Sequence, residues 1–229
     1  MSFDATVTAI HNAGIRVVRG LPDHPEPVPV GWALGALRAA SGPPLRLVLP
    51  VPGDIRGVPG IPELLAAATR AGQLVVGSGL ALLPDGERAD GSGWLAHQVT
   101  DPASVPTSPG AQQTVSQATG ALRLAVLAAT DELAALDVAH WNPEVVSLRQ
   151  REQPVSLPPD HEPAAAALAI RCSQLAAILE LAGDDAPGGS INASGAGRRD
   201  AALRPLAVAV REGLMTAYSH VPISRTVDR

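Results

Sequence analysis

Lysine is missing from this chain: all 17 basic side chains among its 229 residues are arginines. A guanidinium group keeps its proton, so it cannot form a Schiff base, act as a desolvated amine base or replace the lysine of a phosphate-binding P-loop. Pyridoxal phosphate held by a Schiff base and the standard P-loop nucleotide fold are therefore excluded, and the cofactor, if any, is unknown. The richness in residues with GC-rich codons explains the missing lysine as genome composition, but the exclusion holds whatever its origin.

Aromatic side chains are also scarce, with one Phe, one Tyr and three Trp. Stacking on nucleobases is thus poorly provided for. The formal net charge is −5, and both parts of the chain share it: 7 Arg stand against 9 acidic residues before Pro109, and 10 Arg against 13 from there on. Neither part has the basic excess typical of a protein that binds nucleic acid or an anionic membrane, so we expect neither partner.

Cysteine occurs once, at Cys172. A single cysteine excludes an internal disulfide and a thiolate-rich zinc site, and it suits a reducing compartment. The N-terminal sequence MSFDATVTAI has no basic segment before an apolar run, and no run in the chain approaches 18 uncharged apolar residues. The sequence therefore predicts neither export nor a membrane span, and it predicts a cytoplasmic location.

Glycine and proline divide the chain up to Pro109 into short apolar runs, with 14 of the 22 prolines in this part. Prolines between residues 22 and 29 predict an extended connector, and LRLVLPV at 45–51 predicts a strand buried on both faces. The expected order is strand, helix, strand, helix and three further strands, over residues 15–18, 32–40, 45–51, 62–71, 73–76, 80–83 and 94–99. This pattern predicts a small α/β layer with a mixed sheet.

Three long helices are predicted after that layer, over 111–140, 163–182 and 199–218. The first carries a seam at alternating spacings of four and three, formed by Val115, Thr119, Leu122, Val126, Ala129, Leu133, Leu136 and His140. Its length of about 30 residues, about 45 Å, exceeds that of the other two helices. The seam therefore serves either the internal core alone or, in addition, a homodimer.

The predicted fold class is α+β, with the α/β layer followed by a bundle of the three helices. Residues 1–108 form the α/β part and residues 109–229 the helical part, and the two are either separate domains or packed together as a single domain. The segment 183–197 is rich in Gly and Ser and low in hydrophobicity, so we expect it to be mobile.

The loop from Pro50 to Gly60, PVPGDIRGVPG, is the main candidate site because it follows a predicted buried strand and precedes a helix. Gly53 and Gly57 allow tight backbone approach, Asp54 can orient a hydroxyl or ammonium group, and Arg56 can bind a carboxylate or phosphate. In the alternative interpretation this is an ordinary turn, in which Asp54 caps a backbone amide and pairs with Arg56. The string matches neither GxGxxG nor the P-loop.

This loop string resembles one found in uncharacterised proteins of high-GC Gram-positive bacteria, and the likeness extends over most of the chain. Such a family brings no known activity. The resemblance therefore implies no substrate, cofactor or site residue.

Two weaker candidates lie in the helical part. Arg198 and Arg199 join the glycine-rich segment to a predicted helix start, where they hold either an anion or solvated charges. Asp137 and His140 share a helix face as an acid/base pair or metal ligands, or His140 is a helix-end residue bonded to Asp137. The other predicted helices lack matching ligands, so no metal site is expected. Cys172 lies on an apolar face and is expected to be buried and inert.

The absence of a recognisable catalytic set leaves two functional hypotheses, and whether the protein is an enzyme stays open. The first is a protein that acts through self-association or protein binding, as a homodimer through the helical part. The second is a small-molecule enzyme or sensor that binds an anionic ligand at the loop from Pro50 to Gly60, with Arg56 as the clamp.

Overall fold

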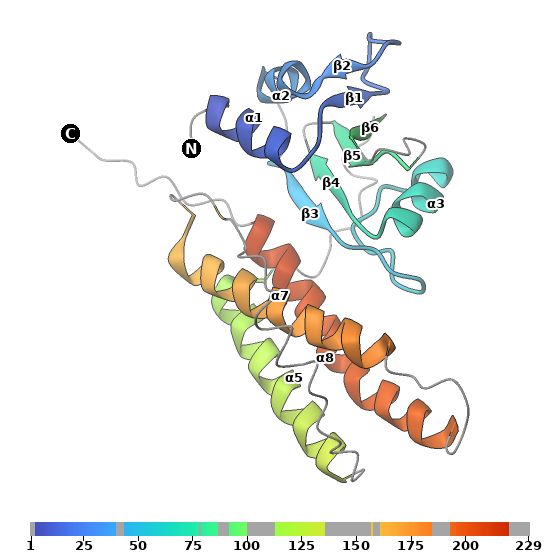
Figure 1. The fold of residues 1–229 in the computed structure, drawn as a ribbon, viewed down its shortest axis with the longest axis vertical. Helices are drawn as coiled ribbons and strands as arrows, with labels where there is room; N and C mark the ends of the chain where they lie inside the picture. The colour runs from blue at the N-terminus through green and yellow to red at the C-terminus, as the bar shows by residue number, and fades with distance from the viewer. Residues whose placement is uncertain are drawn as a thin grey trace, which may run out of the picture. The chain divides into compact units, whose positions relative to one another are not determined.

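The computed structural model describes residues 3–39, 44–77, 79–86, 92–99, 113–135, 157, 161–184 and 193–219. The chain divides into two compact units, Met1–Gln112 and Gln113–Arg229. The first unit contains a mixed sheet with helices, and the second contains three long helices (Figure 1). The predicted α+β fold class is confirmed.

The sheet of the first unit has six strands in the order β2-β1-β6-β5-β4-β3. Among the described strands only β1 and β6 pair in parallel, and the other neighbours are antiparallel, so the mixed sheet is as predicted. The strands are β1 (Val17–Arg19), β2 (Val28–Pro29), β3 (Arg46–Val48), β4 (Leu74–Gly77), β5 (Leu80–Pro84) and β6 (Gly93–Gln98).

Helices cover both faces of this sheet. Helix α2 (Val30–Ala39) packs on one face, together with residues of α1 (Phe3–Asn12), whereas α3 (Pro62–Ala71) packs on the other. Side chains alternate along a strand, so β5 places Leu80 and Leu82 in the α2 core and Ala81 and Leu83 in the α3 core. The central strand β5 is thus buried on both faces.

Two predictions for this unit were wrong in detail. The run at 45–51 was expected to be a strand buried on both faces, but β3 is a three-residue edge strand of which only Val48 is fully buried. The proline-rich connector contains β2, which lies at the opposite edge, where the missing N–H of Pro29 can be tolerated. Helix α1 was not predicted, and it has no fully buried side chain.

A backbone contact at Gly20 shows why one of the glycines is needed. Its φ of +77° is in the left-handed region, and a Cβ added there would lie 2.5 Å from the carbonyl oxygen of Ala96 on β6. Any side chain would collide with the neighbouring strand and strain the backbone. Gly20 therefore allows the chain to leave β1 while staying close to β6.

The second unit is built around helix α8 (Ala193–Ser219). This helix packs against both α5 (Val115–Ala135) and α7 (Pro163–Asp184), which contact each other much less. It runs in the opposite direction to both of them (Figure 1). The core combines buried residues of all three helices, including Leu122, Ala129, Leu168, Cys172, Leu206 and Val210.

Side-chain caps fix the starts of α5 and α7. The Thr114 N–H donates to Oε1 of Gln117 at 2.8 Å, and the Gln117 N–H donates to Oγ1 of Thr114 at 3.2 Å. This reciprocal capping box begins α5 at Val115, four residues after the predicted start. Glu162 accepts a hydrogen bond from the Ala165 N–H at 2.9 Å, which caps α7.

The predicted seam of α5 is largely the face that packs inward. Val115, Leu122 and Ala129 are buried, but Thr119 is exposed and Ala118 is buried in its place. Within the described residues α5 has 21 residues, against 22 in α7 and 27 in α8. The longer first helix, from which a homodimer was expected, is therefore not seen in the described part of the chain.

Within the described residues, one helix is long and apolar enough to cross a membrane by length and composition, namely α7 over Pro163–Gly183, with a mean hydropathy of 1.5. A mostly buried core helix of a soluble protein meets the same criterion, whereas 22% of this window in α7 is buried. Leu168 and Cys172 of α7 pack in the bundle core, and Arg171 and Glu180 lie within the same helix. We therefore describe α7 as a bundle helix.

Candidate functional site

The loop from Pro50 to Gly60 consists of two consecutive turns. Val51 and Asp54 exchange backbone hydrogen bonds of 3.0 and 2.9 Å around Pro52 and Gly53, and Gly53 has φ +85°. The Val58 N–H then donates to the Ile55 carbonyl at 3.1 Å, with Gly57 at φ +91°. Glycine at the third position of a turn with positive φ is typical of type II. The two glycines thus serve the local turns.

Asp54 and Arg56 close on each other in this loop. The Arg56 Nε donates to Oδ1 of Asp54 at 2.8 Å, and Nη2 donates to Oδ2 at 2.7 Å. The backbone N–H of Arg56 also donates to Oδ1, at 3.2 Å. This pair occupies the Nε edge of the guanidinium, so an anion that binds Arg56 at that edge would have to replace the Asp54 carboxylate. This geometry favours the turn interpretation, and a ligand site at Gly53, Asp54, Arg56 and Gly57 stays a prediction.

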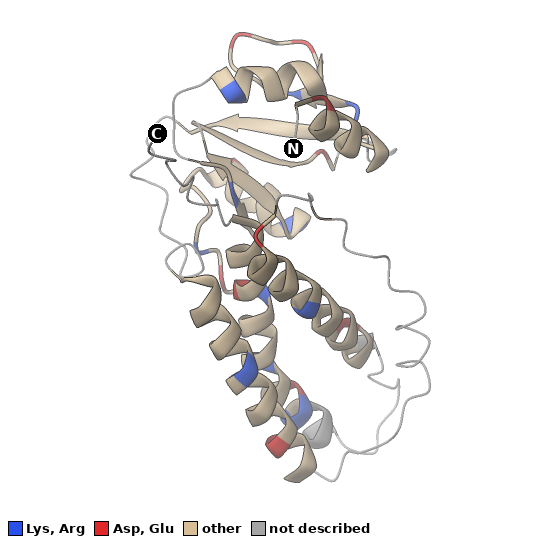
Figure 2. Cartoon of the chain, turned by 90° about the vertical axis from the view of Figure 1, so that its left-hand side faces the viewer, with Lys and Arg blue, Asp and Glu red and all other residues tan. Residues whose placement is uncertain are grey.

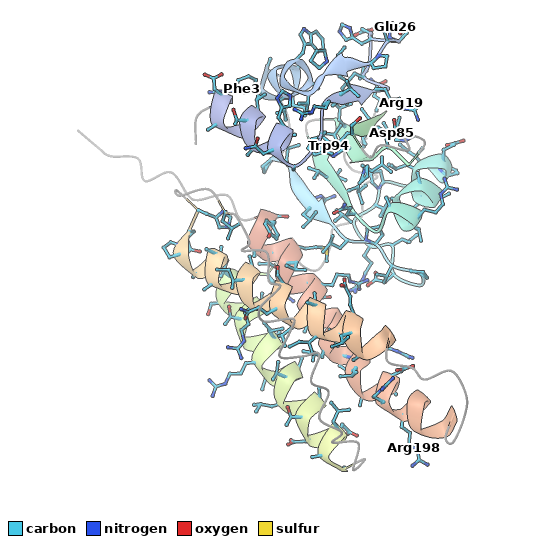
Figure 3. All side chains as sticks on the ribbon, in the orientation of Figure 1. Phe3, Arg19, Glu26, Asp85, Trp94 and Arg198 are labelled. Carbon is cyan, nitrogen blue, oxygen red and sulfur yellow. The ribbon has the colours of Figure 1, made fainter. Side chains whose placement is uncertain are left out.

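A second ion pair joins Arg19, the last residue of β1, to Asp85, which follows β5. The Arg19 Nη2 donates to Oδ1 of Asp85 at 2.8 Å, and Nε donates to Oδ2. Figure 3 labels both side chains in the first unit. The Asp85 side chain is 1% exposed, so its charge is paired rather than left buried alone. The pair links two strands that are not neighbours in the sheet, and we assign it a structural role.

Sequence reasoning missed the Arg19–Asp85 pair because the residues are 66 positions apart and neither stands in a motif.

His97 was also set aside, although it is on β6 and its Nε2 is buried without a hydrogen-bond partner. Burial lowers the pKa of His97, and the nearby Glu63 carboxylate raises it in part. Among the described residues no group of three His, Cys, Asp or Glu side chains could hold a metal ion.

The weaker candidates in the helical unit have different outcomes. Helix α8 begins at Ala193, so Arg198 and Arg199 lie inside it and not at its start; Figure 3 labels Arg198 on this helix. They therefore lack the free helix N-terminus on which the expected anion site depended. Asp137 and His140 lie outside the described residues. Cys172 is buried, and burial raises the pKa of its thiol to about 11, as expected of an inert cysteine.

The second unit exposes large apolar side chains on all three of its described helices, with Tyr218 of α8 41% exposed. On α5, Leu124 is 69% and Leu127 is 53% exposed, and on α7, Ile170 is 43% and Ile178 is 41% exposed. Figure 2 shows the three helices with few charged residues over much of their length. Scattered surface leucines are common, but this pair on α5 lies one turn apart on one side of the helix.

The apolar surface on α5 is more extensive than its two leucines. We define the outer face of α5 as Gly120, Ala121, Leu124, Leu127, Ala128 and Asp131, all of them exposed. At 3.6 residues per turn this face is opposite the buried residues Val115, Ala118, Leu122 and Ala129. Helix α5 thus has an apolar stripe on both sides. The outer face of α5 is the candidate functional site that the described residues support best.

Two family models match the chain, one in each unit. Residues 1–109 match the model of the Rv1486c-like protein, N-terminal domain, and residues 116–215 match that of the Rv1486c-like protein, C-terminal domain. No curated protein and no solved structure matches the chain. The matches name a protein family and no activity, in keeping with the expected resemblance; its high-GC Gram-positive source stays a prediction.

Proposed function

The chain belongs to the Rv1486c-like family, whose two domain models match it in succession, and we propose that it acts by protein association, with a second copy of the same chain as the partner. The observation that carries this proposal is the exposure of Leu124 and Leu127 on α5, 69% and 53%. Both belong to the outer face of α5, whereas the inward face of the same helix already serves the bundle core. An uninterrupted apolar patch on a soluble protein is typical of an interaction surface.

Covering the outer face of α5 would contribute on the order of a few kcal/mol to the free energy of association. Complete burial of a leucine side chain contributes about 1.5–3 kcal/mol. Since more than half of each side chain is still exposed, covering both leucines would contribute about 2–4 kcal/mol. Two identical faces would supply this twice in a two-fold dimer, which offsets part of the entropy lost on association.

A helical surface with few charges suits a protein partner better than a charged ligand. Between Leu124 and Ala128 the α5 helix carries no charged residue. Charged residues are depleted at the centre of protein interfaces, which are more apolar than the rest of the surface. We also propose a cytoplasmic location, which the single buried cysteine supports.

Sedimentation velocity over a range of micromolar concentrations tests the proposal. The wild-type chain should sediment as a dimer, and Leu124→Glu combined with Leu127→Glu should be monomeric. The matched control places two glutamates at exposed alanines of α8, Ala201→Glu and Ala207→Glu, and should remain dimeric. Circular dichroism at 222 nm verifies that both variants keep their helices. A monomeric wild type would overturn the proposal, and so would a dimer that neither pair of substitutions affects.

A further inference from the structure

The outer face of α5 has the repeat of a helix that packs against another helix. Gly120, Leu124, Leu127 and Asp131 follow one another at spacings of four, three and four, and all are exposed. This is the repeat of a coiled-coil seam. From it we infer that two copies of the chain pair through this face, with their α5 helices antiparallel; this inference rests on the proposed function.

Gly120 is the first observation that favours a helix partner. It lies inside α5, where glycine destabilises a helix relative to alanine. A Cβ added at Gly120 would meet no atom within 4 Å, so the described structure has no internal use for the missing side chain. Ala121 and Ala128, also on the outer face of α5, add only small side chains to it. Small residues allow two helix backbones to approach closely, which gives Gly120 a role at an interface.

Charge selects the antiparallel direction. Arg123 and Asp131 are exposed and lie on either side of the two leucines. With a two-fold axis midway between Leu124 and Leu127, each Leu124 faces Leu127 of the partner, and Asp131 faces the partner's Gly120, about one turn from its Arg123. Opposite charges then come together twice in the dimer.

A parallel pair in register is less favourable on the same face. It would place Asp131 directly opposite Asp131 of the partner, and like charges at facing positions destabilise an interface. It would also place each leucine against its own copy and leave Gly120 opposite Gly120, without a side chain to fill the gap. The antiparallel pair instead places a side chain opposite each glycine.

A distance between spin labels separates the two directions. Ser116 is exposed near the start of α5, and Ser116→Cys can be labelled in a Cys172→Ala background. In the antiparallel pair residue 116 lies level with residue 135 of the partner, 19 positions along the axis, so its two copies are about 30 Å apart. In the parallel pair they are about 10 Å apart. Pulsed electron paramagnetic resonance should therefore give a distance between the two labels of about 30 Å.

Charge exchange provides a second measurement on the same dimer. Asp131→Arg alone and Arg123→Asp alone should each raise the dimer dissociation constant roughly three- to tenfold at low salt, a range set by exposed pairs counted twice. The two substitutions together should restore most of the affinity, because the charges are exchanged across the interface. Thr130→Arg, outside this face but exposed on the same helix, is the control and should leave the dissociation constant unchanged.

The outcomes distinguish this inference from the proposed function. A dimer with a label distance of about 10 Å, or without recovery in the doubly exchanged variant, would overturn the antiparallel pairing while the association stands. A chain that is monomeric at all concentrations would overturn both. A dimer broken by substitutions at Ile170 and Ile178 of α7, and not by those on α5, would place the association elsewhere and reject the inference.

Discussion

The contact between Cys172 of α7 and Gly213 of α8 can be tested by a pair of substitutions. A Cβ added at Gly213 would lie 2.5 Å from Sγ of Cys172, closer than the two atoms can approach, and 3.6 Å from a methyl group of Leu168. Cys172 is fully buried in the bundle core. Gly213→Ala should therefore push the two helices apart, unless the sulfur is removed at the same time.

The two opposing effects of Gly213→Ala have comparable size. Alanine stabilises a helix interior by about 1 kcal/mol relative to glycine, and forcing an extra carbon into a packed core costs about 1–3 kcal/mol. Cys172→Ala alone removes one buried atom and should cost about 0.5–1.5 kcal/mol, as other single-atom deletions do. In the double variant the collision is absent and the helix gain remains. We expect a coupling of about 1–3 kcal/mol in favour of the double variant.

Urea unfolding followed at 222 nm measures the three variants and the wild type. Gly197→Ala is the matched control, because Gly197 lies in the same helix and an added Cβ there meets no atom within 4 Å. This control should show only the helix gain, a stabilisation of about 1 kcal/mol. If the effects of Gly213→Ala and Cys172→Ala simply add within about 0.5 kcal/mol, the close packing of α7 on α8 at this point is refuted.

Two further predictions concern the first unit. Burial lowers the pKa of His97 below its ordinary value, so the folded state binds this proton less readily than the unfolded chain; stability from this group is present above about pH 6.5 and is lost as the pH falls. The melting temperature of His97→Gln should decline less than that of the wild type between pH 7.5 and 5.5, and equal declines would refute the assignment. Because Arg56 is paired with Asp54, phosphate and carboxylates should shift the melting temperature of the wild type and of Arg56→Ala equally; a shift seen only in the wild type would favour the ligand site.

The sequence correctly predicted those elements whose form depends on residues close together in the chain. Helix α3 spans Pro62–Ala71 as predicted, because Pro62 stands in its first turn and Gly72 ends it with φ +67°. The strands expected over 80–83 and 94–99 also form, as β5 and β6, which pair antiparallel. In α5 the spacing of Val115, Leu122 and Ala129 identified the inward face. Each of these depends on residues within a few turns of one another.

Features that depend on distant partners were not predictable in the same way. The apolar run at 45–51 does not reveal that β3 lies at an edge of the sheet. Its position depends on pairing with β4, the one described strand beside it, which lies about 25 residues further along the chain. Arg19 and Asp85 meet only after β1, β6 and β5 have assembled. The start of α8 at Ala193 was missed because a glycine- and serine-rich sequence has low helix propensity, which packing of the rest of the helix can override.

The same reasoning explains why the outer face of α5 escaped notice. A helix in a bundle needs one apolar stripe, and the inward stripe of α5 satisfies that expectation, so the sequence pattern does not single out Leu124 and Leu127. Exposed leucines are uninformative one at a time. Here they are one turn apart, they are flanked by Gly120 and Ala128, and no charge lies between Arg123 and Asp131. A monomer gains no stability from this arrangement and loses some helix propensity at Gly120, whereas the proposed pairing with a second copy of the same helix would use every one of these features.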